Sequence, residues 1–169
     1  MIILNSSLAD VNTIFNLYNQ ATEHQKKVFT KNWVGFEKSL IEAEILENHQ
    51  WKIIVDGQIA CVFATTFNDP LIWEEKDLEP SIYIHRIATA TAFRGNGFVK
   101  HIANWAVQYA KTVNRSFVRL DTWGGNIKLN QYYMDCGFTY LGTRSLKDSS
   151  RLPAHYKEGE LYSLFEIPV

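Results

Sequence analysis

The sequence predicts a mixed α/β (α+β) fold with one central, mostly antiparallel sheet and about four flanking helices. Three observations lead to this prediction. Apolar residues recur at helical spacing over two long stretches, residues 8–18 and 97–112. The dipeptide Asp56-Gly57, a hairpin signal, separates two β-rich stretches. The expected elements follow one another in the order β-α-α-β-β-β-α-β-α-β-β, which fits one mixed sheet better than separate layers.

The first elements are a short strand and two helices. Residues 2–4 can form the strand. Ser7 suits a helix N-cap, and Asp10 adds negative charge to the first turn, where the helix dipole favours it. We expect the helix that follows to end at the polar stretch 23–27 and a second helix to cover residues 36–47.

Three strands and one irregular segment come next. Residues 51–55 and 59–67 are expected to pair across the hairpin turn. Residues 68–80 carry several carboxylates and are expected to be irregular. Residues 82–89 are rich in β-branched and aromatic residues and predict a strand.

The remaining elements alternate between helix and strand. The apolar stripe over 97–112 predicts an amphipathic helix, and residues 117–121 predict a strand after it. A shorter helix is expected over 126–136, and residues 139–144 and 161–167 are expected to close the sheet.

Composition excludes several classes of function. The chain has 169 residues, which suggests one domain spanning 1–169, and a formal net charge of -1, which gives no case for nucleic acid as a partner. Cys61 and Cys136 lie in apolar stretches and are expected to be reduced and buried. No CxxC pair or zinc-like histidine spacing occurs, so we expect no metal site. No apolar run approaches the roughly 20 residues that span a bilayer, so we expect a cytoplasmic protein without membrane attachment.

The most informative segment is the turn Arg94-Gly95-Asn96-Gly97, which follows an expected strand and opens an expected helix. Free N–H groups at a helix start attract anions, glycines let an anion approach the backbone, and the arginine adds a full positive charge. The segment therefore favours a phosphate or pyrophosphate site, although glycines that merely satisfy unusual backbone angles are the alternative. Neither a third glycine nor a GK[ST] run follows, which excludes a Rossmann fingerprint and a P-loop.

Two motifs resemble the GNAT superfamily of N-acetyltransferases. Residues 94–99, Arg-Gly-Asn-Gly-Phe-Val, match that family's [Q/R]-x-x-G-x-[G/A] signature except at Val99. Asn126, Tyr133 and the pair Gly137-Phe138 reproduce its N-x(6)-Y-x(3)-G-F pattern. The resemblance implies the GNAT fold, an acyltransferase activity and acetyl-CoA as the acyl donor.

The resemblance also implies roles for particular residues. The backbone of Ile87, Ala88 and Thr89 would pair with the pantetheine amides, Asn126 would hydrogen-bond the pantetheine arm, and Tyr133 would lie near the sulfur. The pyrophosphate would be held by Arg94, Gly95, Asn96, Gly97, Phe98 and Val99.

Acetyl transfer needs a neutral amine, donors for the oxyanion and a proton for the departing thiolate. Tyr133 is the expected general acid. His85 is the first candidate for the base because an ordinary histidine titrates near neutrality, and Glu75 and Glu79 are alternatives. Asp121 could instead orient the amine. No cysteine occupies an obvious nucleophile position, which favours direct attack in a ternary complex.

The acceptor is expected to be a primary amine of a small molecule or peptide. We expect Trp33, Glu75 and Asp121 to border its pocket, since carboxylates and aromatic rings suit a cationic amine. Core packing of Trp33 and a merely solvated acidic loop are the alternatives. Two other classes of function also stay open, a catalytically silent acyl-CoA-binding regulatory module and an interaction domain without CoA. We expect a monomer or homodimer.

Overall fold

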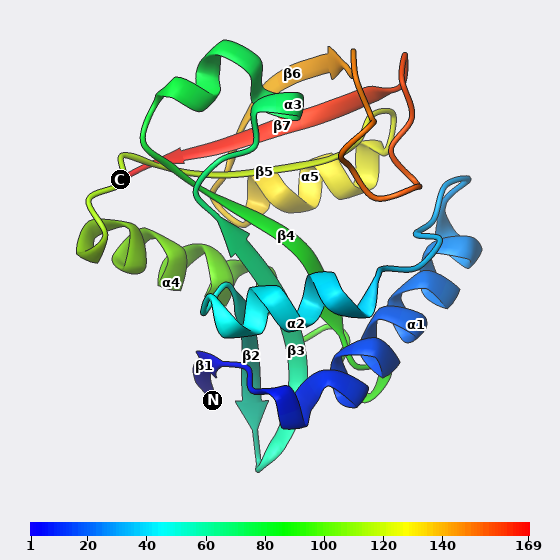
Figure 1. Cartoon of the computed structure of the whole chain (residues 1–169), viewed down its shortest axis with the longest axis vertical. Coiled ribbons are helices and arrows are strands. Elements are labelled where there is room, and N and C mark those ends of the chain that lie inside the picture. Colours follow the sequence, from blue (N-terminus) through cyan, green and yellow to red (C-terminus); the bar gives the residue numbers. More distant parts are fainter. The chain divides into compact units, whose positions relative to one another are not determined.

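A computed structural model describes all residues, 1–169. The chain forms two compact units (Figure 1). The first contains residues 1–65 and 85–97, and the second contains residues 66–84 and 98–169. One strand, β4, begins in the second unit and ends in the first. A single domain over 1–169 stays a prediction.

The predicted α+β class is confirmed. The strands are β1 (Ile2–Asn5), β2 (Gln50–Val55), β3 (Gln58–Thr66), β4 (Ser81–Thr89), β5 (Phe117–Trp123), β6 (Thr139–Ser145) and β7 (Leu161–Pro168). The helices are α1 (Val11–Val28), α2 (Lys38–Leu46), α3 (Pro70–Trp73), α4 (Phe98–Thr112) and α5 (Ile127–Asp135). Short 3-10 turns are η1 (Leu8–Asp10), η2 (Glu74–Leu78) and η3 (Thr91–Phe93). The seven strands follow the order β1-β2-β3-β4-β5-β7-β6.

In the first unit, antiparallel strands β1, β2 and β3 carry α1 and α2 on one face (Figure 1). The hairpin expected at Asp56-Gly57 joins β2 to β3 and sets Ile53 opposite Cys61. Apolar side chains from both helices and two strands form the core between these layers. Its buried members are Val11, Ile14, Leu17, Tyr18, Ile41, Ile45, Val62 and Ala88.

Ser7 caps a helical turn as predicted, but this turn is the 3-10 turn η1, and α1 itself begins at Val11 with Asp10 as its N-cap. The end of α1 also differs from the prediction. The Ser7 backbone N–H and hydroxyl both donate to the Asp10 carboxylate, at 2.7 and 2.9 Å, which closes a capping box. The helix then continues through residues 23–27, where we expected it to end. An ion pair between Glu23 and Lys26, one turn apart at 2.7 Å, supports this polar last turn.

In the second unit, β5 lies between β4 and β7. Residues Ser81–Tyr83 of β4 pair in parallel with β5, and β7 pairs antiparallel with both β5 and β6. Helix α5 packs on β7 through Tyr133 and Phe165, whose ring centroids are 5.2 Å apart. This contact fixes the helix that carries the predicted general acid.

The stretch expected to be irregular, residues 68–80, instead folds as α3 and η2. Pro70 occupies the first turn of α3, where its missing N–H costs nothing. The acidic side chains of this segment are tied to arginines of two strands, Glu79 to Arg119 and Glu74 to Arg144. These tertiary ion pairs order a stretch that has weak local propensity.

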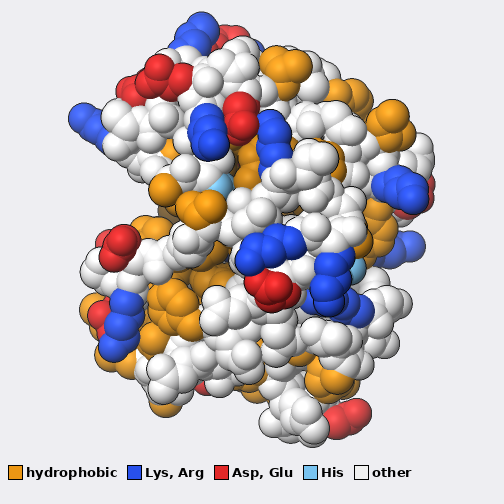
Figure 2. Space-filling model, turned by 90° about the vertical axis from the view of Figure 1, so that its right-hand side faces the viewer, with side chains coloured by type: hydrophobic (Ala, Val, Ile, Leu, Met, Phe, Trp, Pro, Cys, Tyr) orange, Lys and Arg blue, Asp and Glu red, His pale blue; other side chains and the backbone are white.

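Both cysteines are buried free thiols, as expected. No helix is both long and apolar enough to cross a membrane. On the face in Figure 2, Lys and Arg side chains stand among Asp and Glu side chains. This mixture agrees with the near-zero net charge of the chain.

Candidate active site

The predicted phosphate turn lies directly before α4. Gly95 and Gly97 have φ values of 86° and 66°, left-handed conformations that glycine adopts at little cost. A Cβ at either position would meet no atom within 4 Å, so the backbone here is open to a ligand. The Asn96 side chain donates to the carbonyl of Phe93 at 2.8 Å and steadies the turn. An anion could approach this backbone from the solvent side.

The last two residues of the predicted motif differ from the others. The side chains of Phe98 and Val99 are only 4% and 9% exposed. Any contact they make with a phosphate would therefore come from their backbone N–H groups in the first turn of α4. Val99, which departs from the family pattern, packs in the core.

One residue of helix α1, Gln20, hydrogen-bonds the segment that leads into this turn. Its side-chain carbonyl accepts from the Thr91 N–H at 2.8 Å and from the Thr91 hydroxyl at 2.9 Å. Its main-chain carbonyl accepts from the Arg94 guanidinium at 2.9 Å. Gln20 was not among the predicted residues, and nothing in its local sequence distinguishes it from other polar positions of α1.

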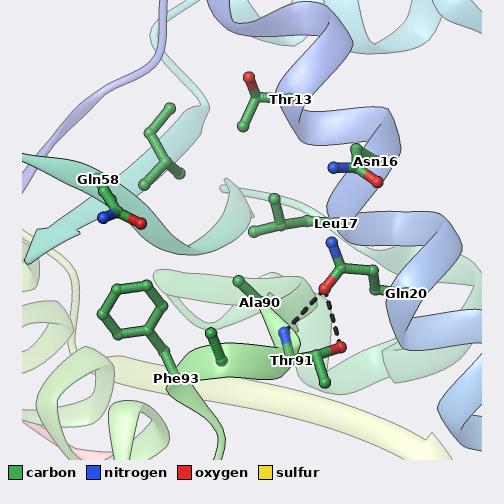
Figure 3. Close-up of a pocket in the computed structure, with 10 residues that line it drawn as sticks. Thr13, Asn16, Leu17, Gln20, Gln58, Ala90, Thr91 and Phe93 are labelled. Carbon is green, nitrogen blue, oxygen red and sulfur yellow. Dashed lines mark hydrogen bonds between the residues drawn. The ribbon is translucent and has the colours of Figure 1, made fainter.

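A pocket of about 680 Å³ opens beside Gln20 in the first unit (Figure 3). None of the predicted site residues lines it, and its walls carry no charged side chain. Its lining combines amide and hydroxyl groups with apolar side chains. The lining residues are Thr13, Asn16, Leu17, Gln20, Gln58, Ile59, Ala90, Thr91, Ala92 and Phe93.

The predicted pantetheine-binding segment is the carboxyl end of β4. The Ala88 side chain is buried in the core under α1 and α2. The Thr89 hydroxyl donates to the sulfur of Cys61 at 3.5 Å, and the following N–H, of Ala90, donates to the carbonyl of Ala60 at 2.9 Å. These contacts hold the end of the segment against β3.

Just before that segment, Arg86 has φ 50°, a left-handed value in the middle of a strand. Its guanidinium pairs with the carboxylate of Glu44 on α2 and hydrogen-bonds the hydroxyl of Tyr18 on α1. The guanidinium also lies over the ring of Phe36, 5.4 Å from its centroid. A non-glycine residue with this backbone conformation often marks a functional constraint.

Trp33, a predicted acceptor residue, belongs to an aromatic cluster of the same unit. Its ring meets Tyr18 edge-on at 5.7 Å and Phe36 at 5.3 Å. Its backbone N–H donates to the side-chain carbonyl of Gln25 at 2.9 Å. The ring is packed against the core but not fully buried, so both a packing role and an acceptor-binding role fit its position.

Tyr133 lies on α5 with its ring against Phe165 and, at 6.2 Å, against Phe138. Its hydroxyl makes no hydrogen bond within the protein. Burial, with the nearby Asp121 charge as a smaller contribution, raises the pKa of Tyr133 above its ordinary value. The phenol therefore keeps its proton at neutral pH.

Asn126 is the N-cap of α5, and its side-chain carbonyl accepts from the Leu129 N–H at 3.1 Å. The same side chain has two N–H donors, which make no hydrogen bond within the protein. They suit the predicted bond to a pantetheine carbonyl.

Asp121 lies inside β5, opposite Leu164 of β7, and not at the end of the strand as its sequence position suggested. One carboxylate oxygen accepts from the Tyr156 hydroxyl at 3.4 Å. The other oxygen is buried and has no hydrogen-bond partner. Burial raises the pKa of Asp121 to about 7.

A second carboxyl group, that of Asp69, has an oxygen within 4.8 Å of an Asp121 oxygen. Asp69 is 7% exposed, and its backbone N–H donates to Asp77 at 2.7 Å. Burial and the charges of Asp121 and Asp77 raise the pKa of Asp69 well above its ordinary range. Two carboxylates this close cannot both ionise easily, so the pair holds a proton near neutral pH.

His85, the predicted base, lies in β4. Burial, followed by the charge of the adjacent Arg86, lowers the pKa of His85 to about 3. Its imidazole is therefore neutral at pH 7, but it is a weaker base than an ordinary histidine. The assignment of His85 as the base stays a prediction, and the low basicity of the imidazole argues against it.

Glu75, the third predicted acceptor residue, lies in η2 with its side chain 69% exposed. Arg144 of β6 donates to its carboxylate at 2.9 Å. The ion pair already satisfies this group, so Glu75 would have to exchange Arg144 for a substrate amine.

Residues 12–138 match the model of the GNAT acetyltransferase family. The chain belongs to the GNAT family of acetyltransferases. Members of this family acetylate amines and use acetyl-CoA, so the protein is an N-acetyltransferase.

Individual GNAT proteins resemble this chain along most of its length. It is 25% identical over 141 residues to the uncharacterized N-acetyltransferase YesJ of Bacillus subtilis, covering 79% of this chain and 78% of that protein. A GNAT acetyltransferase structure from Listeria monocytogenes superimposes with a TM-score of 0.78 at 22% identity, over 99% of this chain and 94% of the other. YncA from Salmonella typhimurium, solved with acetyl-CoA, gives 0.69 at 11% identity, over 99% and 93%. These two structures support the GNAT fold alone.

The carboxyl pair predicts a measurable stability effect. The pKa of Asp69 is raised by folding, so the folded state binds this proton more tightly and loses stability as the pH rises above about 4. Asp69→Asn removes one charge and keeps an N-cap residue for α3. We expect the variant to melt about 2–4 °C higher at pH 8, with the gain disappearing toward pH 4. Equal destabilisation at both pH values, in thermal unfolding followed by circular dichroism, would contradict this expectation.

Proposed function

We propose that this GNAT protein moves the acetyl group of acetyl-CoA to a primary amine of a small molecule or peptide, by direct attack in a ternary complex. One observation carries the proposal. The second unit holds a protonated phenol, Tyr133, and a carboxylate that titrates near neutrality, Asp121, close enough for the charge of one to raise the pKa of the other. An acid and a base with separated pKa values are what the two proton transfers of this reaction require.

The cofactor would be held mainly by backbone. The open glycine turn at 95–97 and the start of α4 suit the pyrophosphate, and Arg94 adds charge. Ile87, Ala88 and Thr89 would offer strand-like N–H and C=O groups to the pantetheine, with the Asn126 amide as a further donor. Bound acetyl-CoA would supply the activated thioester.

The proton inventory balances with these two residues. Asp121 would orient the ammonium group of the acceptor and take one of its protons, so an N–H bond breaks and an O–H bond forms. The neutral amine would then attack the thioester carbon. The nitrogen of the tetrahedral intermediate would still carry one proton more than the amide product. As the C–S bond breaks, Tyr133 would give its proton to the sulfur, so that free CoA leaves as a thiol, and the Tyr133 phenolate would take the extra proton from the nitrogen. Asp121 would then release its own proton to solvent.

The surroundings of Asp121 favour a cationic acceptor. The Tyr156 hydroxyl donates to its carboxylate. The Tyr156 ring stacks on Tyr162 at 5.2 Å and lies tilted against His155 at 4.8 Å. His155 in turn packs edge-on against Trp123 at 5.6 Å. Aromatic faces beside a carboxylate attract an ammonium group before it loses its proton.

The test is a panel of primary amines and amino-terminal peptides, assayed for free CoA with a thiol reagent. We expect at least one amine to release CoA in stoichiometric amounts with acetylated product. Binding of acetyl-CoA without turnover by any amine would favour the catalytically silent module instead. If calorimetry detects no binding at millimolar acetyl-CoA, both the enzyme and the catalytically silent module are contradicted.

Asp121→Asn should abolish the proton acceptor while keeping the Tyr156 contact. We expect kcat/KM to fall about 10²–10³-fold. In the wild type, kcat/KM should rise with pH through about 7, because only ionised Asp121 accepts a proton. The variant should lose that rise, which a pH profile between 5 and 9 measures.

Asp69→Asn is the matched control for this profile. The charge of Asp121 raises the pKa of Asp69, so Asp69 keeps its proton where Asp121 titrates, and the variant should keep the rise in kcat/KM near pH 7. Tyr133, Tyr156 and Tyr162 also face Asp121, but burial or like charge raises the pKa of Tyr133 and Tyr162, so neither titrates in this range. A rise in kcat/KM that persists in Asp121→Asn, or a midpoint that moves away from 7 in Asp69→Asn, would show that another group is the base, with His85 next in line.

A further inference from the structure

The pocket beside Gln20 has the size of a small-molecule site, and no step of the proposed reaction uses it. Its volume of about 680 Å³ lies within the roughly 300–1,000 Å³ that ligand pockets occupy. All of its lining residues belong to the first unit. Residues of α1 form one side, and Gln58 and Phe93 lie across from them (Figure 3). A cavity of this size can hold a molecule much larger than a water or a simple ion.

The polar groups of this pocket are all uncharged. The lining contains three side-chain amides, Asn16, Gln20 and Gln58, and two hydroxyls, Thr13 and Thr91. An amide presents a donor and an acceptor side by side, which is how asparagine and glutamine bind the edge of a nucleobase. A phosphate, a carboxylate or an ammonium group would find no opposite charge among these residues. The lining therefore favours an uncharged ligand with adjacent donors and acceptors.

The apolar groups of the pocket suit the faces of a flat ring. Phe93 is half-buried, and its ring lies on the side away from α1 (Figure 3). The other apolar lining residues are Leu17, Ile59, Ala90 and Ala92. Proteins that bind single nucleobases hold the ring by stacking on aromatic or apolar side chains while polar groups bind its edge. The pocket offers both kinds of contact.

Gln20 connects the pocket to the glycine turn. Its side-chain carbonyl already accepts from the Thr91 N–H and hydroxyl, at 2.8 and 2.9 Å. Its amide nitrogen points away from Thr91 in Figure 3 and makes no hydrogen bond within the protein. Its main-chain carbonyl accepts from Arg94, the first residue of the turn, at 2.9 Å. A ligand that accepts from the amide nitrogen would hold Gln20 in the orientation that supports this segment.

We propose that the pocket binds the base of a free nucleoside, as a second molecule beside acetyl-CoA, and that an occupied pocket strengthens acetyl-CoA binding through Gln20. The adenosine of acetyl-CoA itself is a poor match, because its ribose carries a 3′-phosphate and the lining has no cation. The site does not depend on the acid and base of the transfer step. The coupling rests on the proposed function, in which the turn at 94–97 holds the pyrophosphate.

Calorimetry of the full chain with adenosine, guanosine, cytidine and uridine tests the site, and ribose separates the base from the sugar. We expect at least one nucleoside to bind with a dissociation constant below about 1 mM, and ribose not to bind. Saturating acetyl-CoA should tighten nucleoside binding about 5-fold or more, and by linkage the nucleoside should tighten acetyl-CoA binding by the same factor.

Two substitutions remove one kind of contact each. Asn16→Leu deletes an amide, and we expect nucleoside binding to weaken about 3- to 10-fold, the factor that one neutral hydrogen bond contributes. Phe93→Leu deletes the ring but keeps an apolar side chain, and the expected loss is about 5- to 30-fold. Asn19→Leu is the matched control, because Asn19 is exposed on the same helix and does not line the pocket. It should bind the nucleoside like the wild type. Urea denaturation checks that all three variants remain folded.

Absence of nucleoside binding in a protein that binds acetyl-CoA would overturn the site, and so would equal nucleoside affinity in Asn16→Leu, Phe93→Leu and the control. Displacement of the nucleoside by acetyl-CoA would also overturn it, because the base would then occupy the cofactor's own site. Equal nucleoside affinity with and without acetyl-CoA would overturn the link through Gln20. A failure to bind acetyl-CoA would contradict the proposed function but not the nucleoside site, which is measured without the cofactor.

Discussion

Replacing Tyr133 with phenylalanine is expected to lower kcat about 10²–10⁴-fold, the usual contribution of a general acid. The hydroxyl makes no hydrogen bond within the protein, and the ring contacts with Phe165 and Phe138 stay in the variant. We therefore expect stability to change by less than about 0.5 kcal/mol and acetyl-CoA affinity to remain the same. Steady-state kinetics on an identified amine, with calorimetry for the cofactor, measures both.

The neighbouring Tyr132 provides the control. It lies on the same helix, its side chain is 39% exposed, and its ring is 6.2 Å from that of Tyr133. Tyr132→Phe should keep kcat within about twofold, since a surface substitution of this kind has small effects. Full activity in Tyr133→Phe, or an equal loss in both variants, would show that the thiolate takes its proton from elsewhere. The raised pKa of Tyr133 also predicts that loss of its proton does not limit the rate below pH 10.

The parts of the site that the sequence predicted depend on local patterns. The turn at 94–97 needs glycine at fixed positions, and both glycines have positive φ. The second motif places Asn126 as an N-cap and Tyr133 two turns later, so both sit on one short helix. Patterns of this kind can be recognised in the sequence because a few adjacent residues determine the backbone conformation.

The residues that were missed act through partners far away in the sequence. Asp69 is unremarkable in its own loop, and only the fold brings Asp121 near it and changes the basicity of both. The left-handed Arg86 has no sequence signal, because glycine would mark such a position and arginine does not. His85 shows the same limit for a residue that the sequence did indicate, because burial, which the sequence does not reveal, removes the basicity that made it the first candidate.

The prediction that residues 68–80 are irregular was wrong because the segment is ordered by a residue far away in the sequence, Arg119. This residue is fully buried, and its guanidinium lies between the rings of Trp73 and Phe117, 4.8 and 4.7 Å from their centroids. It donates to Glu166 at 2.7 Å, and it pairs with Glu79. One arginine thus ties the α3–η2 segment to β5 and β7.

Arg119→Met should destabilise the protein by about 3–5 kcal/mol at pH 7, because Glu166, only 14% exposed, would be left as an unpaired buried charge. Urea denaturation measures this loss. Adding Glu166→Gln should recover part of it, since the stranded charge is then gone. Arg144→Met is the control, because Arg144 also ties this segment to the sheet but is 25% exposed. Its expected cost is about 1 kcal/mol or less. If Arg119→Met cost no more than Arg144→Met, burial of the guanidinium would not be what orders the segment.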